Sequence, residues 1–231
     1  GGFTADGREY ILMLEAGQTT PAPWVNVIAG RRLGLVVSER GGIYTWVDNA
    51  HEYRLTTWYN DPVSDPCGEA FYLRDEATGR FWSLTPSPTP GRAGYTCRHG
   101  FGYTVFEHAE DGLACETWIY AALDAPVRCL VVKVTNRTAH PRALSLTAFH
   151  ELVLGEWRHD NLMHIQTETD TQSGLLLMHN PYSRIYPRRV VFASCSERET
   201  VLSGDRTEFL GRLGDRRRPA ALQRIGLAGT V

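Results

Sequence analysis

The stretch YTVFEHAEDGLACETWIYAALDAPVRCLVVKVTN, residues 103–136, decides the fold class of this chain. It consists of runs rich in aromatic and β-branched residues, and the first two runs are separated by Asp111-Gly112. Such runs favour β-strands, and an Asp-Gly pair favours the tight turn of a hairpin. The stretch therefore predicts consecutive antiparallel strands.

The last run of this stretch, VRCLVVKVTN (127–136), is mostly apolar on both of its alternating faces. Alternate residues of a strand point to opposite sides of a sheet. The two faces are formed by Val127, Cys129 and Val131 and by Leu130, Val132 and Val134. A strand that is apolar on both sides is typical of a buried position. We therefore predict a central strand with other structure packed on each side.

Similar runs recur along the rest of the chain, separated by turn residues such as Gly41-Gly42. The other expected strands are residues 33–38, 42–47, 69–75, 143–155, 174–180 and 189–195. Nine or more strands without a domain-scale linker predict one all-β domain over residues 1–231, a large two-sheet antiparallel sandwich with few short helices. The proline-rich segment 84–94 is expected to be a surface loop.

One helix is indicated near SGDRTEFLGR (203–212). Asp205 is expected to be its N-cap, Glu208 follows three residues later as in a capping box, and Gly211 is expected to end it.

The composition excludes several functional classes. Basic and acidic residues nearly cancel, at 24 against 26, so the chain has no broad field that would attract nucleic acid or an anionic membrane. The five cysteines are widely spaced and include no CxxC pair, so neither a disulfide framework nor a zinc site is expected. No apolar run is long enough for a membrane helix. We expect a soluble domain that does not itself insert into a membrane.

The familiar signatures of nucleophilic hydrolases, zinc proteases and nucleotide-binding loops are missing from the sequence. HGFGY (99–103) precedes a predicted strand, so its glycines are interpreted as part of a tight bend. NRT (136–138) is interpreted as a turn. HDNLMH (159–164) holds two histidines and an aspartate but lacks a third convergent ligand, so we expect a polar or structural role and no metal. No cofactor is predicted.

The segment RLTTWYNDPVSDPCGE (54–69) is both aromatic and acidic. Its carboxylates Asp61 and Asp65 could in principle flank a glycosidic bond. Acidic residues beside prolines, however, more commonly form turns. Aromatic faces next to amide groups suit sugars, because apolar C–H groups stack on the ring while hydroxyls need fixed polar partners. Trp58 and Asn60 fit that description.

Several motifs together resemble a known family. They are TPAPW (20–24), NDPVSDP (60–66), RHGFGYTVFEH (98–108) and GDRTEFLGR (204–212). In this order they resemble the amino-terminal domain of glycoside hydrolase family 94. That family includes inverting disaccharide phosphorylases, such as cellobiose phosphorylase, and the phosphorylase region of cyclic β-1,2-glucan synthases. The resemblance covers nearly the whole chain and is closest to the glucan synthase branch.

The resemblance implies a β-supersandwich, similar to galactose mutarotase, that precedes an (α/α)6 barrel. In that family the general acid and the phosphate-binding residues lie in the barrel, which this chain lacks. We therefore expect a fragment of a larger chain with no catalytic residue of its own. The implied partners are a β-linked glucan or disaccharide, with β-1,2 linkage favoured, the protein's own barrel and a second copy in a homodimer. A cyclic glucan synthase would be an inner-membrane protein with this domain on its cytoplasmic side.

The expected substrate-binding residues come from two segments. In cellobiose phosphorylases a Gln-Arg pair of the sandwich contacts the sugar, and the corresponding place here is NLMHIQT (161–167), where that pair is not preserved. A differently linked glucan could be served by other polar residues of this segment. The complete set is Arg54, Trp58, Asn60, Asp61, Asn161, His164 and Gln166.

Two other functions remain open from the sequence. The first is an aldose 1-epimerase, which needs a glutamate and a histidine facing one cleft. His99 and His159 are the candidate histidines. The second is a structural module that orients the barrel or forms a dimer, and it would expose a large apolar patch when isolated.

Overall fold

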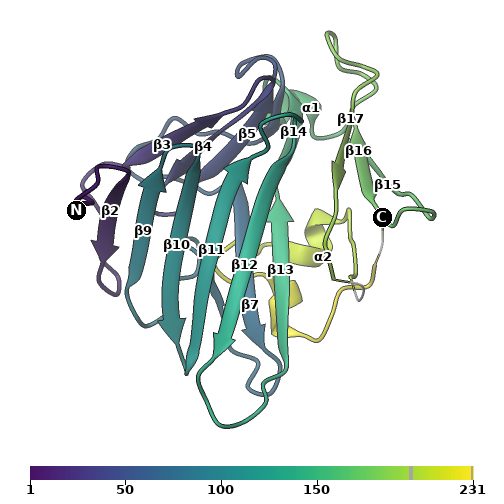
Figure 1. Ribbon diagram of the computed structural model, residues 1–231. Helices are drawn as coiled ribbons and strands as arrows, with labels where there is room; N and C mark the ends of the chain where they lie inside the picture. Colours follow the sequence, from purple (N-terminus) through teal and green to yellow (C-terminus); the bar gives the residue numbers. More distant parts are fainter. Residues whose placement is uncertain (198–199, 230) are drawn as a thin grey trace.

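The computed structural model describes residues 1–197, 200–229 and 231, and within them the chain is nearly all β (Figure 1). The few helices are short: α1 (Arg158–Asn161), α2 (Arg206–Leu210) and a 3₁₀-helix, η1 (Ala220–Gln223). The predicted all-β class with few short helices is confirmed. The strands are β1 (Gly2–Phe3), β2 (Glu9–Leu14), β3 (Val25–Ala29), β4 (Leu33–Ser38), β5 (Ile43–Val47), β6 (Arg54–Thr56), β7 (Glu69–Asp75), β8 (Phe81–Ser83), β9 (Tyr95–Gly100), β10 (Tyr103–Glu110), β11 (Leu113–Ala121), β12 (Arg128–Asn136), β13 (Leu144–His150), β14 (Leu152–Gly155), β15 (Gln166–Thr169), β16 (Leu176–His179) and β17 (Val190–Ala193).

The stretch 103–136 forms three consecutive antiparallel strands, β10, β11 and β12, as predicted. They belong to a six-stranded sheet with the order β1-β2-β9-β10-β11-β12. Asp111 and Gly112 have φ values of 50° and 76°, which is the left-handed backbone that a tight hairpin turn requires. The HGFGY segment spans the end of β9 and the start of β10, and Phe101 and Gly102 form the tight bend between them, with a φ of 86° at Gly102.

The position predicted for residues 127–136 is wrong. Within the described residues β12 pairs only with β11 and forms the edge of its sheet. Leu130 and Val132 pack against the core, whereas Val131, on the other face, is 47% exposed. Although both faces of β12 are apolar in sequence, only one of them is buried. No other described residues cover the outer face.

The strands divide into four sheets rather than the expected two. Besides the six-stranded sheet there are sheets of order β13-β7-β8, β14-β6-β5-β4-β3 and β15-β16-β17. The run predicted as one strand over 143–155 is interrupted at Glu151, so β13 and β14 pair in different sheets. Glu151 N donates to Gly68 O at 2.8 Å, and Glu151 O accepts from Thr57 N at 3.1 Å. Glu151 therefore links the sheet β13-β7-β8 to the sheet β14-β6-β5-β4-β3.

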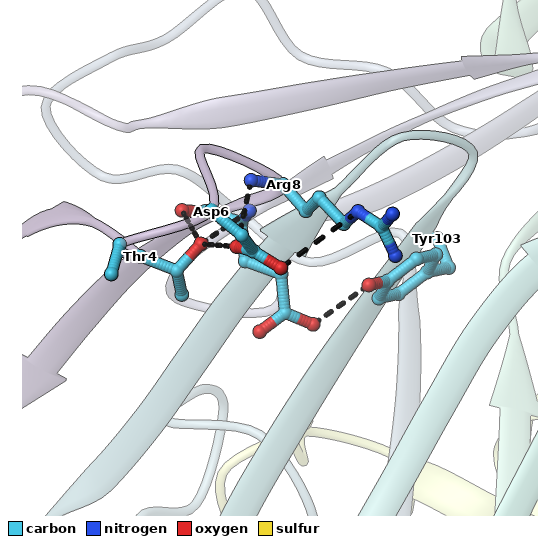
Figure 2. Close-up of a pocket in the computed structure, with 6 residues that line it drawn as sticks. Thr4, Asp6, Arg8 and Tyr103 are labelled. Atoms are coloured by element: carbon cyan, nitrogen blue, oxygen red, sulfur yellow. Dashed lines mark hydrogen bonds and ion pairs between the residues drawn. The ribbon is translucent and has the colours of Figure 1, made fainter.

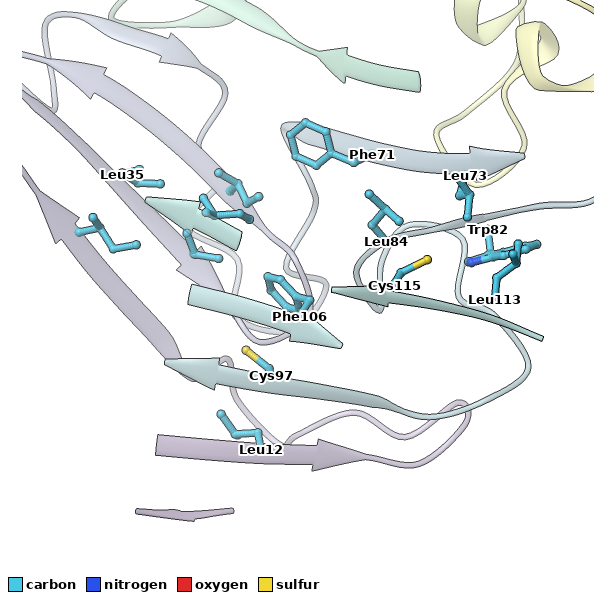
Figure 3. Close-up of a cluster of buried hydrophobic side chains, with 14 of the residues drawn as sticks. Leu12, Leu35, Phe71, Leu73, Trp82, Leu84, Cys97, Phe106, Leu113 and Cys115 are labelled. Carbon is cyan, nitrogen blue, oxygen red and sulfur yellow. The ribbon is translucent and has the colours of Figure 1, made fainter. Parts of the chain in front are cut away.

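The main hydrophobic core lies among three of these sheets (Figure 3). Phe106 and Ile119 of the six-stranded sheet are fully buried, as is Leu35 of the five-stranded sheet. Phe71 and Leu73 reach the same cluster from β7. Leu84 also belongs to it, so the proline-rich segment expected to be a surface loop begins in the core.

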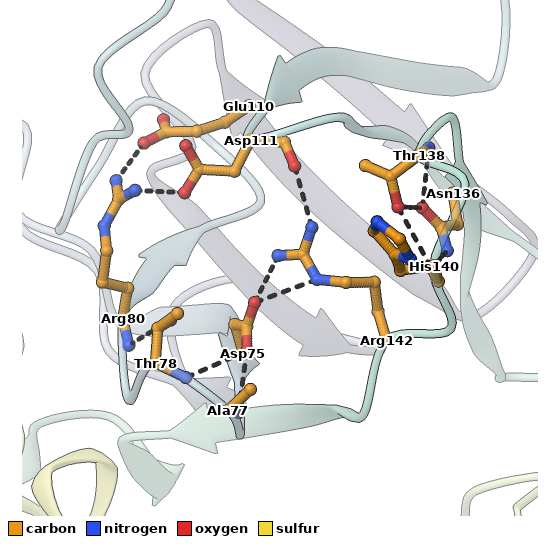
Figure 4. A network of polar contacts seen from close by, with 10 residues as sticks. All are labelled: Asp75, Ala77, Thr78, Arg80, Glu110, Asp111, Asn136, Thr138, His140 and Arg142. Atoms are coloured by element: carbon orange, nitrogen blue, oxygen red, sulfur yellow. Dashed lines mark hydrogen bonds and ion pairs between the residues drawn. The ribbon is translucent and has the colours of Figure 1, made fainter.

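Turns at one end of the six-stranded sheet are held by a polar network (Figure 4). Arg80 forms ion pairs with Glu110 and Asp111. Arg142 pairs with Asp75, and its Nη1 also donates to the backbone oxygen of Asp111 at 2.9 Å. These contacts tie the turn after β7 to the β10–β11 hairpin and to the connection after β12.

The NRT segment (136–138) forms a turn beside this network. Asn136 Oδ1 accepts from Thr138 N at 3.0 Å, and Asn136 Nδ2 donates to His140 O at 2.7 Å. The side chain is thus occupied in shaping a turn, as predicted.

Helix α2 begins and ends where the sequence predicts. The carboxylate of Asp205 accepts from Thr207 N at 2.7 Å, and Gly211, with φ of 89°, ends the helix. Glu208 does not complete a capping box, because its carboxylate accepts from Ser203 Oγ at 2.5 Å and from Arg224 Nη2 at 3.0 Å. No helix in the described part of the chain is long and apolar enough to cross a membrane.

Candidate functional site

A shallow cavity of about 540 Å³ lies at the first turn of the chain (Figure 2). Its polar groups already satisfy one another. Thr4 Oγ1 donates to Asp6 Oδ1 at 2.6 Å, and Tyr103 donates its hydroxyl to Glu9 at 2.7 Å. Arg98 also pairs with Glu9. Because these groups are used internally, the cavity offers a ligand few unsatisfied partners.

A second cavity, of about 320 Å³, lies against the segment 57–66 and the strands β3–β5. Three of the predicted substrate-binding residues line it: Trp58, Asn60 and Asp61. Its other walls are aromatic, apolar and small polar residues: Pro23, Val25, Val36, Ser38, Gly42, Ile43, Tyr44, Thr57, Tyr59, Pro62, Asp65 and Pro66. An apolar cavity with a few fixed polar groups is the usual form of a small-molecule site.

The shape of this loop depends on Asp61. Its Oδ1 accepts from Val63 N at 2.9 Å and from Ser64 N at 3.2 Å, and its Oδ2 accepts from Ser64 Oγ. Asp65 N donates to Asp61 O at 2.9 Å. The interpretation of Asp61 as a turn-forming residue is confirmed, and both of its oxygens are already engaged.

Aromatic rings form one side of the cavity. Tyr44 and Trp58 stack with ring centroids 5.4 Å apart, and Trp58 is 40% exposed. The guanidinium of Arg54 lies 5.3 Å from the Trp58 ring centroid. Arg54 itself is only 5% exposed, because its Nε donates to Ala50 O at 3.0 Å and its Nη1 to Glu156 O at 3.2 Å. Arg54 therefore fixes the indole rather than lining the cavity.

The hydroxyl of Thr57 is an unsatisfied polar group in the cavity wall. Thr57 is 4% exposed, and its Oγ1 has no hydrogen-bond partner among the described residues. A buried hydroxyl without a partner costs free energy. A Cβ at Gly68 would lie 2.5 Å from this oxygen, so glycine there keeps the space beside it open.

Two carboxyl groups near the cavity are partly protected from water. Burial raises the pKa of Asp65, although a hydrogen bond from Ser38 opposes that effect. Burial also raises the pKa of Glu39, which accepts from Trp24 N at 2.8 Å. Asp65 lines the cavity. These two carboxyl groups therefore help to hold the loop and the end of β4 in place.

The second predicted segment lies beside α1 and β15. Asn161 uses its amide within the fold, because its Nδ2 donates to Trp157 O at 2.7 Å and its Oδ1 accepts from Asn180 Nδ2 at 2.7 Å. His164 packs against Tyr182 with centroids 4.8 Å apart. Gln166 is exposed at the start of β15. None of these three lines the second cavity.

The histidines expected for an epimerase are not paired with glutamate in the described residues. His99 contacts Thr104 Oγ1 and Trp24 O, and burial lowers its pKa. His159 contacts Asp160 at 3.4 Å on the exposed surface.

Other histidines do contact glutamates. His108 and Glu110 are both buried, with side chains 1% and 5% exposed, so a substrate could not reach them. In the pair of His150 and Glu69 the carboxylate is fully buried. A third pair, His51 and Glu156, is 3.0 Å apart with side chains 60% and 45% exposed, but neither residue lines the cavity beside Trp58.

Sequence reasoning did not find Tyr44, Thr57 or Trp157. In the sequence Tyr44 looks like an ordinary strand residue. Only the three-dimensional structure shows that the Thr57 hydroxyl is buried without a hydrogen-bond partner. Trp157 is 43% exposed and lies over Arg54, whose guanidinium is 5.0 Å from its ring centroid. Its position two residues before HDNLMH was the one available signal.

Comparison with known proteins gives a consistent result. The model of the glycosyl hydrolase 94 supersandwich domain matches residues 8–231. The chain is 36% identical over 225 residues to the cyclic beta-(1,2)-glucan synthase NdvB of Rhizobium meliloti, which aligns with 96% of this chain and 8% of that protein.

Phosphorylases are also similar. The chain is 28% identical over 236 residues to a solabiose phosphorylase of Paenibacillus borealis, covering 97% of this chain and 30% of that protein. It is 25% identical over 229 residues to an N,N'-diacetylchitobiose phosphorylase of Vibrio furnissii, covering 96% and 28%. The chain thus spans less than a third of the length of each of these relatives.

Proposed function

Because the chain belongs to the glycosyl hydrolase 94 supersandwich family, we propose that it is the carbohydrate-binding and scaffold domain of a glucan-active phosphorylase or cyclic glucan synthase. In this proposal the bond-breaking residues lie elsewhere in the intact protein, in an (α/α)6 barrel.

The cavity beside Trp58 is the observation that carries the proposal. A sugar needs an apolar ring face to stack on and polar groups for its hydroxyls. Trp58 and Tyr44 supply the aromatic surface. The side chain of Asn60 is exposed at the rim and has no hydrogen-bond partner in the described part of the chain. The similarity to a beta-(1,2)-glucan synthase favours β-1,2-linked glucose as the ligand.

The test is isothermal titration of the intact protein with sophorose, the β-1,2-linked glucose disaccharide. We expect Trp58→Ala to weaken binding by at least about tenfold, which is about 1.4 kcal/mol. Trp118→Ala is the matched control, because Trp118 also lies under an arginine, Arg98, at 5.8 Å but on the six-stranded sheet. Equal affinity of the wild type and Trp58→Ala, or no binding by the wild type, would reject the proposal.

A second role, as a contact surface within the assembly, is favoured by exposed apolar residues near α1 and after β16. Met163 is 82% exposed, Tyr182 70% and Ile185 54%. Exposed apolar groups of this size are often covered by a partner surface. In this role the surface meets the protein's own barrel or a second copy.

Met163→Asp distinguishes a covered surface from a free one. In the intact protein a covered Met163 predicts a lower unfolding temperature or weaker self-association by sedimentation velocity. A change below about 0.5 kcal/mol together with unchanged association would show that Met163 is freely solvated.

A further inference from the structure

A row of aromatic rings continues beyond the cavity. Tyr44 lies between Trp46 and Trp58, with centroid distances of 5.1 Å and 5.4 Å. Past Trp58 the row is continued by the guanidinium of Arg54 and then by Trp157. The row therefore connects strand β5 to the segment just before α1, two regions far apart in sequence.

Arg54 sets the spacing of the two exposed indoles. Its Cζ lies 5.3 Å from the ring centroid of Trp58 and 5.0 Å from that of Trp157. The distance between the two indole centroids therefore cannot exceed the sum of these two distances. That separation is within the reach of adjacent or next-adjacent sugar rings in an oligosaccharide.

Hydrogen bonding and packing hold this arrangement in place. Arg54 is 5% exposed, and the acceptors of its Nε and Nη1 are the backbone oxygens of Ala50 and Glu156. Its Nη2 has no partner among the described hydrogen bonds. A planar guanidinium stacked on aromatic rings and anchored in this way is rigid. The rigid guanidinium therefore holds the two indoles at a fixed separation.

Both indoles remain accessible. Trp58 is 40% exposed and Trp157 43% exposed, although each contacts the buried Arg54. Burial in the core does not explain aromatic surface that is left open to this extent. Trp157 also lies beside His159 and His51, with ring centroids 6.3 Å away in each case, so the open part of its ring is the surface that a ligand would contact.

We propose that Trp157 forms a second stacking position for the glucan, so that the protein binds a chain of several sugars through Trp58 and Trp157 instead of a single disaccharide. This inference rests on the proposed function, because it assumes that sugar stacks on Trp58. It identifies the ligand class as a linear or cyclic β-1,2-glucan that is longer than sophorose. Arg54 is the positioning residue between the two stacking positions.

The test measures how affinity depends on chain length. The intact protein is titrated with sophorose and with a linear β-1,2-linked glucose pentasaccharide. We expect the wild type to bind the pentasaccharide about tenfold more tightly. Trp157→Ala should remove that advantage and change sophorose affinity by less than about twofold. Trp157→Phe, which keeps a ring for stacking, should retain part of the advantage.

Circular dichroism and the unfolding temperature of each variant show whether it is folded, and Trp157→Phe preserves the test if Trp157→Ala is not. Equal wild-type affinity for the two sugars, or equal losses for both in Trp157→Ala, would overturn the second stacking position. In either case, sophorose binding that still depends on Trp58 would leave the proposed function intact. Loss of all binding in the wild type would instead reject the proposed function.

Discussion

At the scale of single residues, the carboxylate of Glu69 is held by four side-chain partners. It is fully buried, and its Oε1 accepts from Thr56 Oγ1 at 2.8 Å and from Thr45 Oγ1 at 3.2 Å. Its Oε2 contacts Arg128 and His150. Burial alone would raise its pKa, but the charges of these two partners lower the pKa to about 2.

We predict that Glu69→Gln lowers the free energy of unfolding at pH 7 by about 3–5 kcal/mol, because it leaves Arg128 without its buried counter-charge. The ionised carboxylate stabilises the fold above the ordinary pKa of 4.5, and this contribution is lost as the pH falls towards 2. Urea unfolding from pH 5 to pH 2.5 should therefore show a steeper loss of stability in the wild type than in the variant.

Asp65→Asn is the matched control for that measurement. Because burial raises the pKa of Asp65, its ionised form is less favourable in the folded than in the unfolded state, and stability falls as the pH rises through its pKa. Asparagine also tolerates the positive φ of 40° at this position. Asp65→Asn should therefore keep or slightly increase stability at pH 7. Equal destabilisation by both substitutions would contradict the difference we assign to their environments.

At the scale of secondary-structure elements, β12 is informative because its apolar pattern and its position disagree. As an edge strand it leaves Val131 47% exposed, whereas Ile119 of the neighbouring β11 is fully buried. We predict that Val131→Thr changes the free energy of unfolding by less than about 0.5 kcal/mol. Ile119→Ala should cost about 2–5 kcal/mol through lost burial and a cavity. Chemical denaturation measures both, and a cost above about 1 kcal/mol for Val131→Thr would indicate that β12 is covered.

Helix α2 depends on its N-cap, because a five-residue helix has little stability of its own. Asp205→Ala removes the acceptor for Thr207 N and should cost about 1 kcal/mol. Asp205→Asn keeps an acceptor and should cost only a few tenths of that. Thermal unfolding followed by circular dichroism distinguishes the two, and equal effects would show that the cap contributes little.

At the scale of the whole molecule, Glu151 ties the carboxyl-terminal segment to the sheets. Its side chain is 4% exposed and accepts from Arg158 Nε at 2.7 Å, Arg206 Nε at 2.8 Å and Arg216 Nη1 at 3.3 Å. Burial raises the pKa of this carboxyl, but the opposing effect of the arginines is larger. Its pKa therefore lies below the ordinary value. The same residue joins two sheets through its backbone.

We predict that Glu151→Gln loosens the segment around α2, because three arginines lose their shared counter-charge. Limited trypsin digestion should cleave after Arg212 and Arg217 several-fold faster than in the wild type. Glu107→Gln is the control, since Glu107 is 42% exposed and pairs with Arg98 at the surface. Equal cleavage rates in Glu151→Gln and the wild type would contradict this role.

The sequence alone determined the longest strands, several of the turns between them and the cap of α2. These features depend on neighbouring residues: alternation sets a strand, Asp111-Gly112 adopts positive φ, and Asp205 reaches the backbone two residues later. The loop role of Asp61 was predictable for the same reason. The motifs of the chain were also enough to identify its family, which the match over residues 8–231 confirms.

Only the tertiary structure decided which strands meet and which side chains gather. It placed β12 at an edge, divided the strands among four sheets and brought Trp157 to Arg54 across about a hundred residues of sequence. It also left the Thr57 hydroxyl without a partner. Local propensity carries no information about contacts of this kind, because they depend on how distant segments pack after hydrophobic burial has selected one arrangement.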